Sequence, residues 1–321
     1  MCGIVGYVGP RDAASIILNG LRRLEYRGYD SAGLAILHEN GGIAVRRAVG
    51  KLHNLTEQLT AEPLAGHTGV GHTRWATHGR VNEDNAHPHV SMHGEVAVVH
   101  NGIIENYLDL RRELQAEGVP FASETDSEVV AHLVEREMNR GDGAGSPGLR
   151  HAVCRALDQI QGASAFVFLS RAHPDQLVTA RLGNAGGIVI GQGDGESFVA
   201  SDIPAILQHT RDVIFLEHRQ VAEITPDGCE VFNLDDRPQT PHAVTIPWDP
   251  VAAEKGTYRH FMQKEIAEQP RAITDTIRGR ADFQRGRIHF DHLHLTEVEA
   301  RALEKIIIVA CGTSYHAGLV G

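Results

Sequence analysis

Cysteine stands at position 2, between Met1 and Gly3. Small residues after the first methionine favour its removal, which would leave a chain that begins with cysteine. The α-amine of such a chain has a pKa of about 7.7–8.0, so near neutral pH part of it can accept the thiol proton, directly or through water. Cys2 is therefore a candidate nucleophile with its own base. The alternative is a small residue that merely follows the start codon.

Several strings elsewhere in the chain carry a resemblance to a known family. They are YRGYDSAG (26–33), HTRWATHG (72–79), NAHPH (85–89), VHNGI (99–103) and ETD (124–126). With Cys2 they resemble the N-terminal-nucleophile glutamine amidotransferases. Two further strings, YRHFMQKEIAEQP (258–270) and ACGTSY (310–315), are similar to one branch of that family, the glutamine–fructose-6-phosphate aminotransferases. The resemblance implies transfer of the glutamine amide nitrogen to fructose-6-phosphate, which gives glucosamine-6-phosphate.

The resemblance assigns charged residues to the two ends of glutamine, which is a zwitterion. Arg74 offers a planar guanidinium for the α-carboxylate, and Thr77 and His78 would add hydrogen bonds to the same group. Asp126 offers a carboxylate for the α-ammonium. Considered alone, Arg74 is more typical of a surface salt bridge. Asp126 is also compatible with an acid in the first turn of a helix, a role that could coexist with binding.

The resemblance also assigns the stabilisation of the tetrahedral intermediate to Asn101 and Gly102. A side-chain amide and a backbone N–H would donate to the oxyanion, and one such donor typically contributes about 2.7–4 kcal/mol. The thioester at Cys2 divides one difficult step into two easier ones. Outside the family context, Asn-Gly is also typical of an ordinary turn.

Supporting roles follow for a few more residues. Trp75 resembles the indole that gates the passage of ammonia, with a core aromatic as the alternative. Arg27 is expected to order the loop over Cys2, and His87 either positions the site or satisfies buried carbonyls. Thr313 and Ser314, between an expected strand and an expected helix, would form part of a fructose-6-phosphate site.

Composition limits the remaining function classes. The chain has 321 residues, a length typical of about two domains. Its net charge of −11 and the lack of a basic cluster argue against nucleic-acid binding. Its purely aliphatic stretches fall far short of the roughly 18 residues of a membrane helix. The four cysteines are widely spaced and match no zinc or redox motif, so we expect a cytoplasmic protein without metal or organic cofactor.

Hydrophobic patterns predict many short strands and few helices. Strands are expected at 3–9, 33–37, 43–49, 68–74, 95–100, 164–170, 176–181, 187–191, 197–200, 213–216, 220–224 and 229–233. Helices are expected at 12–26 and 148–161, and after a capping box at 125–128. The glycine-rich segment 191–195 is expected to be a hairpin turn. This order favours antiparallel sheets, and the resemblance implies an α+β fold, a four-layer α/β/β/α sandwich over residues 2–240.

The chain changes character after a proline-rich segment. Residues 241–254 are expected to be a linker, and residues 255–321 an incomplete phosphosugar isomerase (SIS) domain. Helices are predicted at 255–280 and 297–305, and a buried strand at 306–310, which would lack its sheet neighbours. The chain is therefore expected to hydrolyse glutamine without completing amino-sugar synthesis, and the full-length enzyme to be a homodimer.

Two alternatives stay open. The domain could serve another nitrogen acceptor or act as a free glutaminase, which predicts glutamine turnover without a sugar product. It could also be an inert phosphosugar-binding regulator. The intact set of Cys2, Arg74, Asn101, Gly102 and Asp126 argues against the regulator.

Overall fold

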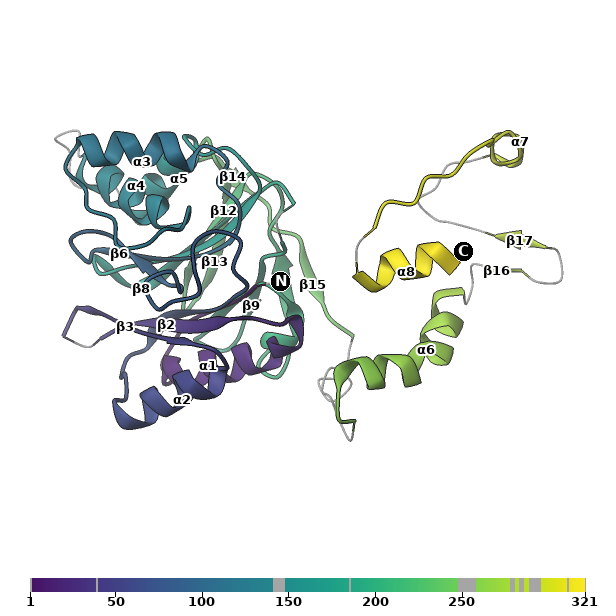
Figure 1. Ribbon diagram of the computed structural model, residues 1–321, viewed down its shortest axis with the longest axis horizontal. Helices are drawn as coiled ribbons and strands as arrows, with labels where there is room; N and C mark the ends of the chain where they lie inside the picture. The colour runs from purple at the N-terminus through teal and green to yellow at the C-terminus, as the bar shows by residue number, and fades with distance from the viewer. Residues whose placement is uncertain are drawn as a thin grey trace. The chain divides into compact units, whose positions relative to one another are not determined.

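The structure is a computed structural model that describes residues 2–38, 40–140, 148–184, 186–247, 258–277, 281–282, 286–288, 296–310 and 312–320. The chain divides into two compact units, Met1–Gly256 and Thr257–Gly321. Each unit has its own secondary structure (Figure 1). Met1 and the segment 248–257, which includes half of the predicted linker 241–254, lie outside the described residues.

The described strands of the first unit form two sheets, and every pairing in them is antiparallel. One sheet has the order β15-β11-β9-β10-β1-β4-β2-β3 and the other β14-β13-β12-β8-β7-β6-β5. The strands are β1 (Gly3–Val8), β2 (Ser31–Leu37), β3 (Ile43–Val49), β4 (Thr68–Arg74), β5 (His89–Val90), β6 (Val96–Gly102), β7 (Ser164–Ser170), β8 (His173–Leu182), β9 (Val189–Gln192), β10 (Ser197–Ala200), β11 (Asp212–Phe215), β12 (Gln220–Thr225), β13 (Gly228–Asn233), β14 (Pro238–Gln239) and β15 (Ala243–Thr245).

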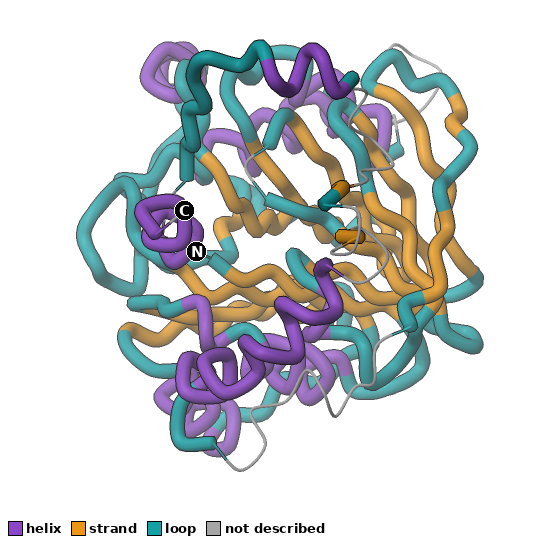
Figure 2. The backbone as a smooth tube through the Cα atoms, turned by 90° about the vertical axis from the view of Figure 1, so that its right-hand side faces the viewer, coloured by secondary structure: helices purple, strands orange, loops and turns teal. Residues whose placement is uncertain are grey.

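Helices cover the outer face of each sheet (Figures 1 and 2). Helices α1 (Ala13–Arg23) and α2 (Leu52–Ala61) pack on the first sheet, and α3 (Tyr107–Ala116), α4 (Glu128–Asn139) and α5 (Leu149–Leu157) lie over the second. Two short 3₁₀ helices, Glu25–Arg27 and Ile203–Ala205, complete the unit. A buried apolar layer that includes Ile4, Val99 and Val167 lies between the sheets. The predicted α/β/β/α layering is confirmed.

The sequence signals for α1 hold in the structure. The Asp12 carboxylate caps the helix by accepting the Ser15 N–H at 3.0 Å. Ile17, Leu21 and Leu24 are fully buried against the sheet, which is the apolar face that the pattern predicts.

The predicted capping box at Thr125–Glu128 is wrong, although the helix it announced is present as α4. Ser127 is the N-cap and makes no capping hydrogen bond with its side chain. The Glu128 carboxylate instead accepts the N–H groups of Ala122 and Ser123, at 2.8 and 2.7 Å. Thr125 Oγ1 lies 3.1 Å from His89 Nε2. A tertiary partner has taken Thr125, and the loop just before the helix has taken Glu128.

Most of the predicted strands are present, and the segment 191–195 is the hairpin turn between β9 and β10, closed by Gly193 N–H to the Glu196 carbonyl at 2.8 Å. Sequence reasoning missed α2, α3, β5, β14 and β15. Strand β15 pairs with β11, so the first sheet continues beyond residue 240, where we expected the domain to end.

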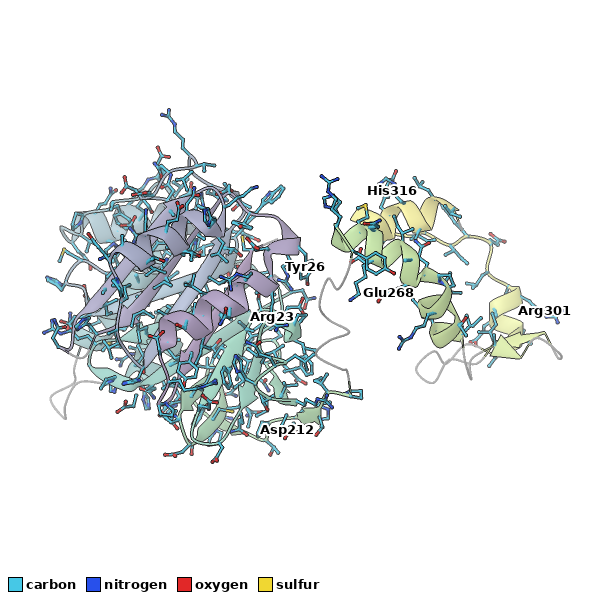
Figure 3. The ribbon with its side chains drawn as sticks, turned by 90° about the horizontal axis from the view of Figure 1, so that it is seen from below. Arg23, Tyr26, Asp212, Glu268, Arg301 and His316 are labelled. Carbon is cyan, nitrogen blue, oxygen red and sulfur yellow. The ribbon has the colours of Figure 1, made fainter. Side chains whose placement is uncertain are left out.

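The second unit contains α6 (Phe261–Ile277), β16 (Ala281–Asp282), β17 (Arg287–Ile288), α7 (Glu297–Arg301) and α8 (Gly312–Val320). Glu268, Arg301 and His316 mark its three helices in Figure 3. Helix α6 confirms one prediction, but α7 is shorter than expected. The buried strand predicted at 306–310 is wrong, because these residues pair with no described strand and Ile306 and Val309 are 77% and 90% exposed. Among the described helices, none is long and apolar enough to cross a bilayer.

Candidate active site

A cavity of about 430 Å³ opens where β4 and β6 end and α4 begins. Strand β4 belongs to one sheet and β6 to the other, so the cavity lies at the edge of the space between the sheets. All ten residues predicted for the glutaminase site line it: Cys2, Arg27, Arg74, Trp75, Thr77, His78, His87, Asn101, Gly102 and Asp126. The structure thus brings together residues from both sheets, and their individual roles stay predictions.

Cys2 directly precedes β1, and β1 is held by its neighbour β4 with Gly3 opposite Thr73. The Cys2 Sγ accepts the Trp75 N–H at 3.1 Å. Burial raises the pKa of the Cys2 thiol, although the Trp75 N–H and the Arg74 charge act in the opposite direction. The thiol therefore stays protonated near neutral pH and needs a base before it can act as a nucleophile.

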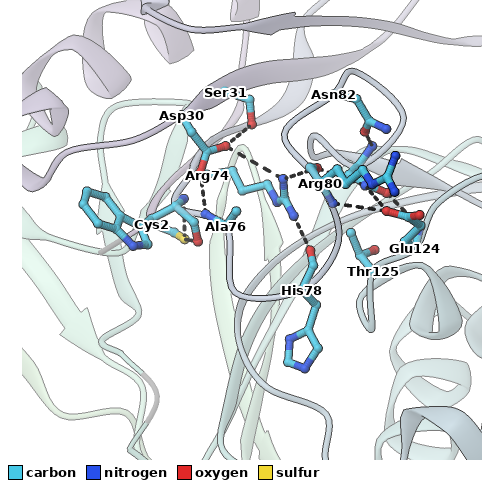
Figure 4. A network of polar contacts seen from close by, with 12 residues as sticks. Cys2, Asp30, Ser31, Arg74, Ala76, His78, Arg80, Asn82, Glu124 and Thr125 are labelled. Atoms are coloured by element: carbon cyan, nitrogen blue, oxygen red, sulfur yellow. Dashed lines mark hydrogen bonds and ion pairs between the residues drawn. The ribbon is translucent and has the colours of Figure 1, made fainter.

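Arg74 is buried at the end of β4, which excludes the surface salt bridge as its role. Its guanidinium donates to the carbonyls of His78 and Arg80, the second at 3.3 Å, and lies 3.8 Å from the Asp30 carboxylate (Figure 4). Asp30 also accepts the Ala76 N–H at 2.5 Å. The loop after β4 therefore folds around the guanidinium and fixes one positive charge at the cavity.

Asp126 is buried just ahead of the N-cap of α4, so it is not an acid in the first turn of that helix. Its Oδ2 accepts the Ile104 N–H at 2.8 Å, and its Oδ1 accepts the Ser127 hydroxyl at 3.4 Å. These contacts fix the carboxylate at the cavity wall. A buried carboxylate in this position favours a cationic group on the ligand.

Asn101 and Gly102 are the last residues of β6 and pair with β7, so they are not an ordinary turn. The Asn101 Nδ2 donates to the Cys2 carbonyl at 3.4 Å. Gly102 has a φ of 137°, and a Cβ at this position would lie 2.2 Å from the Ala163 carbonyl oxygen. Only glycine fits there. The side-chain amide and the glycine thus lie beside the residue that carries the thiol.

Arg27 and the residues around it hold the main chain at Cys2. Its Nη1 donates to the Cys2 carbonyl at 3.2 Å and to the Ser201 hydroxyl at 3.3 Å. Its Nη2 donates to the Asp202 carboxylate at 2.6 Å. Arg27 therefore ties the segment after β10 to the first residues of the chain.

Three further predicted residues surround the cavity. Trp75 is 55% exposed, so it is not a core aromatic. Thr77 and His78 both lie in the loop after β4, and His78 Nδ1 is 3.3 Å from Thr77 Oγ1. His87 is buried and its Nδ1 accepts the His100 N–H at 3.3 Å.

Sequence reasoning missed a cluster of buried histidines beneath the cavity. His72 stacks on His87 with ring centroids 4.2 Å apart, and His89 meets His87 edge-on at 4.5 Å. Burial lowers the pKa of His72 and His89 to about 3 and that of His100 to about 4. His72 and Asp30 fall within the quoted strings, but their contacts depend on tertiary structure. Among the described residues, no group of His, Cys, Asp and Glu is arranged to hold a metal ion.

Thr313 and Ser314 lie in the first turn of α8, and both are exposed. They belong to the second unit. Their expected contact with fructose-6-phosphate stays a prediction.

Comparison with known proteins agrees with this geometry. The family model for the glutamine amidotransferase domain matches residues 72–208. This part of the chain is therefore similar to a glutamine amidotransferase domain. The match includes the end of β4, all of β6 and the segment that leads into α4, which carry Arg74, Asn101 and Asp126.

The relatives of this amidotransferase domain extend the match over the whole chain. Over 321 residues the chain is 50% identical to the glutamine–fructose-6-phosphate aminotransferase [isomerizing] of Caldanaerobacter subterraneus and 46% identical to that of Aquifex aeolicus. It covers 51% of each relative, so it spans about half the length of the curated proteins it matches.

A solved structure shows the same fold. The glutamine phosphoribosylpyrophosphate amidotransferase from B. subtilis aligns with a TM-score of 0.61 at 24% identity, covering 73% of this chain and 49% of that one. The predicted four-layer α/β/β/α fold of the first unit is confirmed.

Proposed function

We propose that this chain hydrolyses L-glutamine to glutamate and ammonia through a thioester at Cys2. The observation that carries the proposal is the common cavity of Cys2, Arg74, Asn101, Gly102 and Asp126. Its volume of about 430 Å³ is within the usual range for a small-molecule site.

The two fixed charges match the two ends of the substrate. Arg74 provides a cation for the α-carboxylate of glutamine, with Thr77 and His78 on the loop beside it, and Asp126 provides an anion for the α-ammonium. With the amino-acid end held this way, the side-chain amide is directed to Cys2.

The chemical step then follows from the groups around the thiol. The Cys2 sulfur attacks the amide carbon, and the carbonyl π electrons move to oxygen. Asn101 Nδ2 and the Gly102 N–H donate to that oxyanion. The oxyanion re-forms the carbonyl as the C–N bond breaks, and the nitrogen takes up the proton that the thiol lost and leaves as ammonia. Water then attacks the thioester carbonyl, the C–S bond breaks, and a proton from that water restores the thiol as glutamate is released.

The proton on the thiol needs an acceptor, because burial raises the pKa of Cys2. The proposal assigns this role to the α-amine of Cys2 after removal of Met1. Met1 lies outside the described residues, so the state of the N-terminus is a matter for measurement.

For the acceptor we propose fructose-6-phosphate, which gives glucosamine-6-phosphate. The identity to aminotransferases of that name supports this part, together with the exposed Trp75, which suits a gate for ammonia. Thr313 and Ser314 would contribute to the phosphosugar site, residues 255–321 to an isomerase domain and 241–254 to a linker. The family resemblance further implies a cytoplasmic homodimer.

The test measures glutamate and ammonia after incubation with glutamine, and amino sugar when fructose-6-phosphate is added. Cys2→Ala should abolish glutamate release. Cys154→Ala should preserve it, because Cys154 is buried in α5 and absent from the lining of the described cavity. Intact-mass analysis with a diazoketone analogue of glutamine should show a single adduct on a chain without Met1. Glutamine turnover by Cys2→Ala, or at full rate by a chain that retains Met1, would contradict the mechanism.

A further inference from the structure

The side-chain amide of Asn101 is held from two directions. Its Nδ2 donates to the Cys2 carbonyl at 3.4 Å, and its Oδ1 lies 3.0 Å from His72 Nε2. Asn101 is 7% exposed and His72 only 1%. Protein groups therefore set the orientation of this amide, with little competition from water.

The proton between the two side chains can be located. Burial lowers the pKa of His72 to about 3, so near neutral pH the ring is neutral and carries one proton. Asn101 Oδ1 can only accept a hydrogen bond, so the proton is on His72 Nε2. His72 Nδ1 has no hydrogen-bond partner in the described structure, which suits a nitrogen without a proton.

The reverse orientation of the amide is disfavoured at both ends. A flip by 180° would place Asn101 Oδ1 against the Cys2 carbonyl oxygen, so that two acceptors would face each other. It would also direct Nδ2 at His72 Nε2, where two N–H groups would face each other unless the ring proton moved to Nδ1, which has no hydrogen-bond partner in the described structure. The Nε2–H of His72 thus selects the orientation in which Nδ2 faces Cys2.

The elements that carry the two residues make this contact rigid. His72 lies in the middle of β4, opposite Ile4 of β1, and Asn101 lies in β6 of the other sheet. The hydrogen bond therefore crosses from one sheet to the other. Stacking on His87 holds the plane of the His72 ring.

We infer that His72 is a positioning residue that holds the Asn101 amide with Nδ2 directed at the oxyanion of the glutamine reaction. The inference rests on the proposed glutamine hydrolysis, because it explains how one of its oxyanion donors is oriented. His72 is not one of the described residues that line the cavity, so it acts through Asn101 and not on the substrate.

The test compares His72→Leu, which has no donor, with His72→Gln, whose side-chain amide retains one. For glutamine hydrolysis, His72→Leu should lower kcat at least tenfold, up to the roughly 10²–10³-fold loss of a complete oxyanion donor. KM should change less than about threefold, because Arg74 and Asp126 hold the other end of glutamine. His72→Gln should recover most of kcat. His132→Leu is the control, because it removes a buried histidine from α4 away from the cavity and should leave kcat unchanged.

A second reaction separates orientation from damage to the fold. Alkylation of Cys2 by iodoacetamide is a displacement at a saturated carbon and forms no oxyanion. His72→Leu should therefore alkylate at the wild-type rate while it hydrolyses glutamine slowly. The double variant with Asn101→Ala should be no slower than Asn101→Ala alone, because His72 acts through that amide.

Wild-type kcat in His72→Leu would overturn the inference, and so would a parallel loss of alkylation or a multiplicative loss in the double variant. If the leucine variant does not fold, His72→Asn makes the same comparison, because its amide is too short to reach Asn101. A wild-type chain that is alkylated at Cys2 but releases no glutamate would overturn the proposed function itself, which is a different result.

Discussion

Lowering the pH from 7.5 to 5.0 should destabilise the first unit, because it contains buried neutral histidines. Burial lowers the pKa of His72 and His89 to about 3 and that of His100 to about 4, whereas an unfolded histidine has a pKa of about 6.5. Between these values the unfolded chain binds protons that the folded chain does not. This difference does not affect the free energy of unfolding above pH 6.5. It lowers the free energy of unfolding as the pH falls from 6.5 toward 4 and then 3.

The magnitude follows from those values. At pH 5.0 an unfolded histidine is almost fully protonated and the folded one is neutral, so each of the three costs about 2 kcal/mol relative to pH 7.5. Together they cost about 6 kcal/mol, compared with a total stability of about 5–15 kcal/mol for a typical domain. The unit should therefore be close to unfolding at pH 5.

The assay is urea unfolding followed by far-UV circular dichroism at several pH values between 4.5 and 7.5. His89→Gln removes one titrating ring and can still donate to Thr125 Oγ1, so its free energy of unfolding should fall less steeply, by about 1.4 kcal/mol per pH unit. His242→Gln is the matched control, because it replaces an exposed ring between β14 and β15, and its free energy of unfolding should fall as steeply as that of the wild type. Equal slopes for wild type and His89→Gln would refute the assignment of a buried neutral ring at this position.

Three substitutions test the cavity. Gly102→Ala should destabilise the first unit in thermal unfolding and remove glutamine turnover, because its Cβ would meet the Ala163 carbonyl at 2.2 Å with φ at 137°; a stable, active variant would contradict the described end of β6. Asp126→Asn should raise KM for glutamine and lose discrimination against an analogue without the α-amine, by a factor that corresponds to about 1.5–3 kcal/mol for one charged hydrogen bond. Arg74→Lys should also raise KM, because lysine cannot hold the carbonyls of His78 and Arg80 together, and an unchanged KM would remove Arg74 from the binding site.

The sequence predicted the main components of the fold, because strand periodicity and helix caps are local signals. It failed where tertiary contacts replace local ones. Thr125 and Glu128 have the spacing of a capping box, yet the Thr125 hydroxyl contacts His89, which is 36 positions away in the chain. The run 306–310 has the composition of a buried strand, but apolar composition cannot supply a pairing partner.

The candidate site shows the same division. The quoted strings, together with Cys2, contain all ten residues predicted for the glutaminase site, so the resemblance was sufficient to predict the set that the structure gathers. It did not indicate the role of His72, whose partner is 29 positions away on the other sheet. A side chain that acts through another side chain is identified only when both strands are placed.

The two donors to the Cys2 carbonyl, Arg27 and Asn101, have a practical consequence for experiments. Both donate to the main-chain carbonyl of residue 2, and the thiol takes no part in these two hydrogen bonds. The Cys2 thiol can therefore be replaced while the hydrogen bonds to the carbonyl of residue 2 are retained. Cys2→Ala should serve as a substrate trap, a protein that binds glutamine without hydrolysing it. Such a trap would allow the Michaelis complex to be crystallised and its dissociation constant to be measured without turnover.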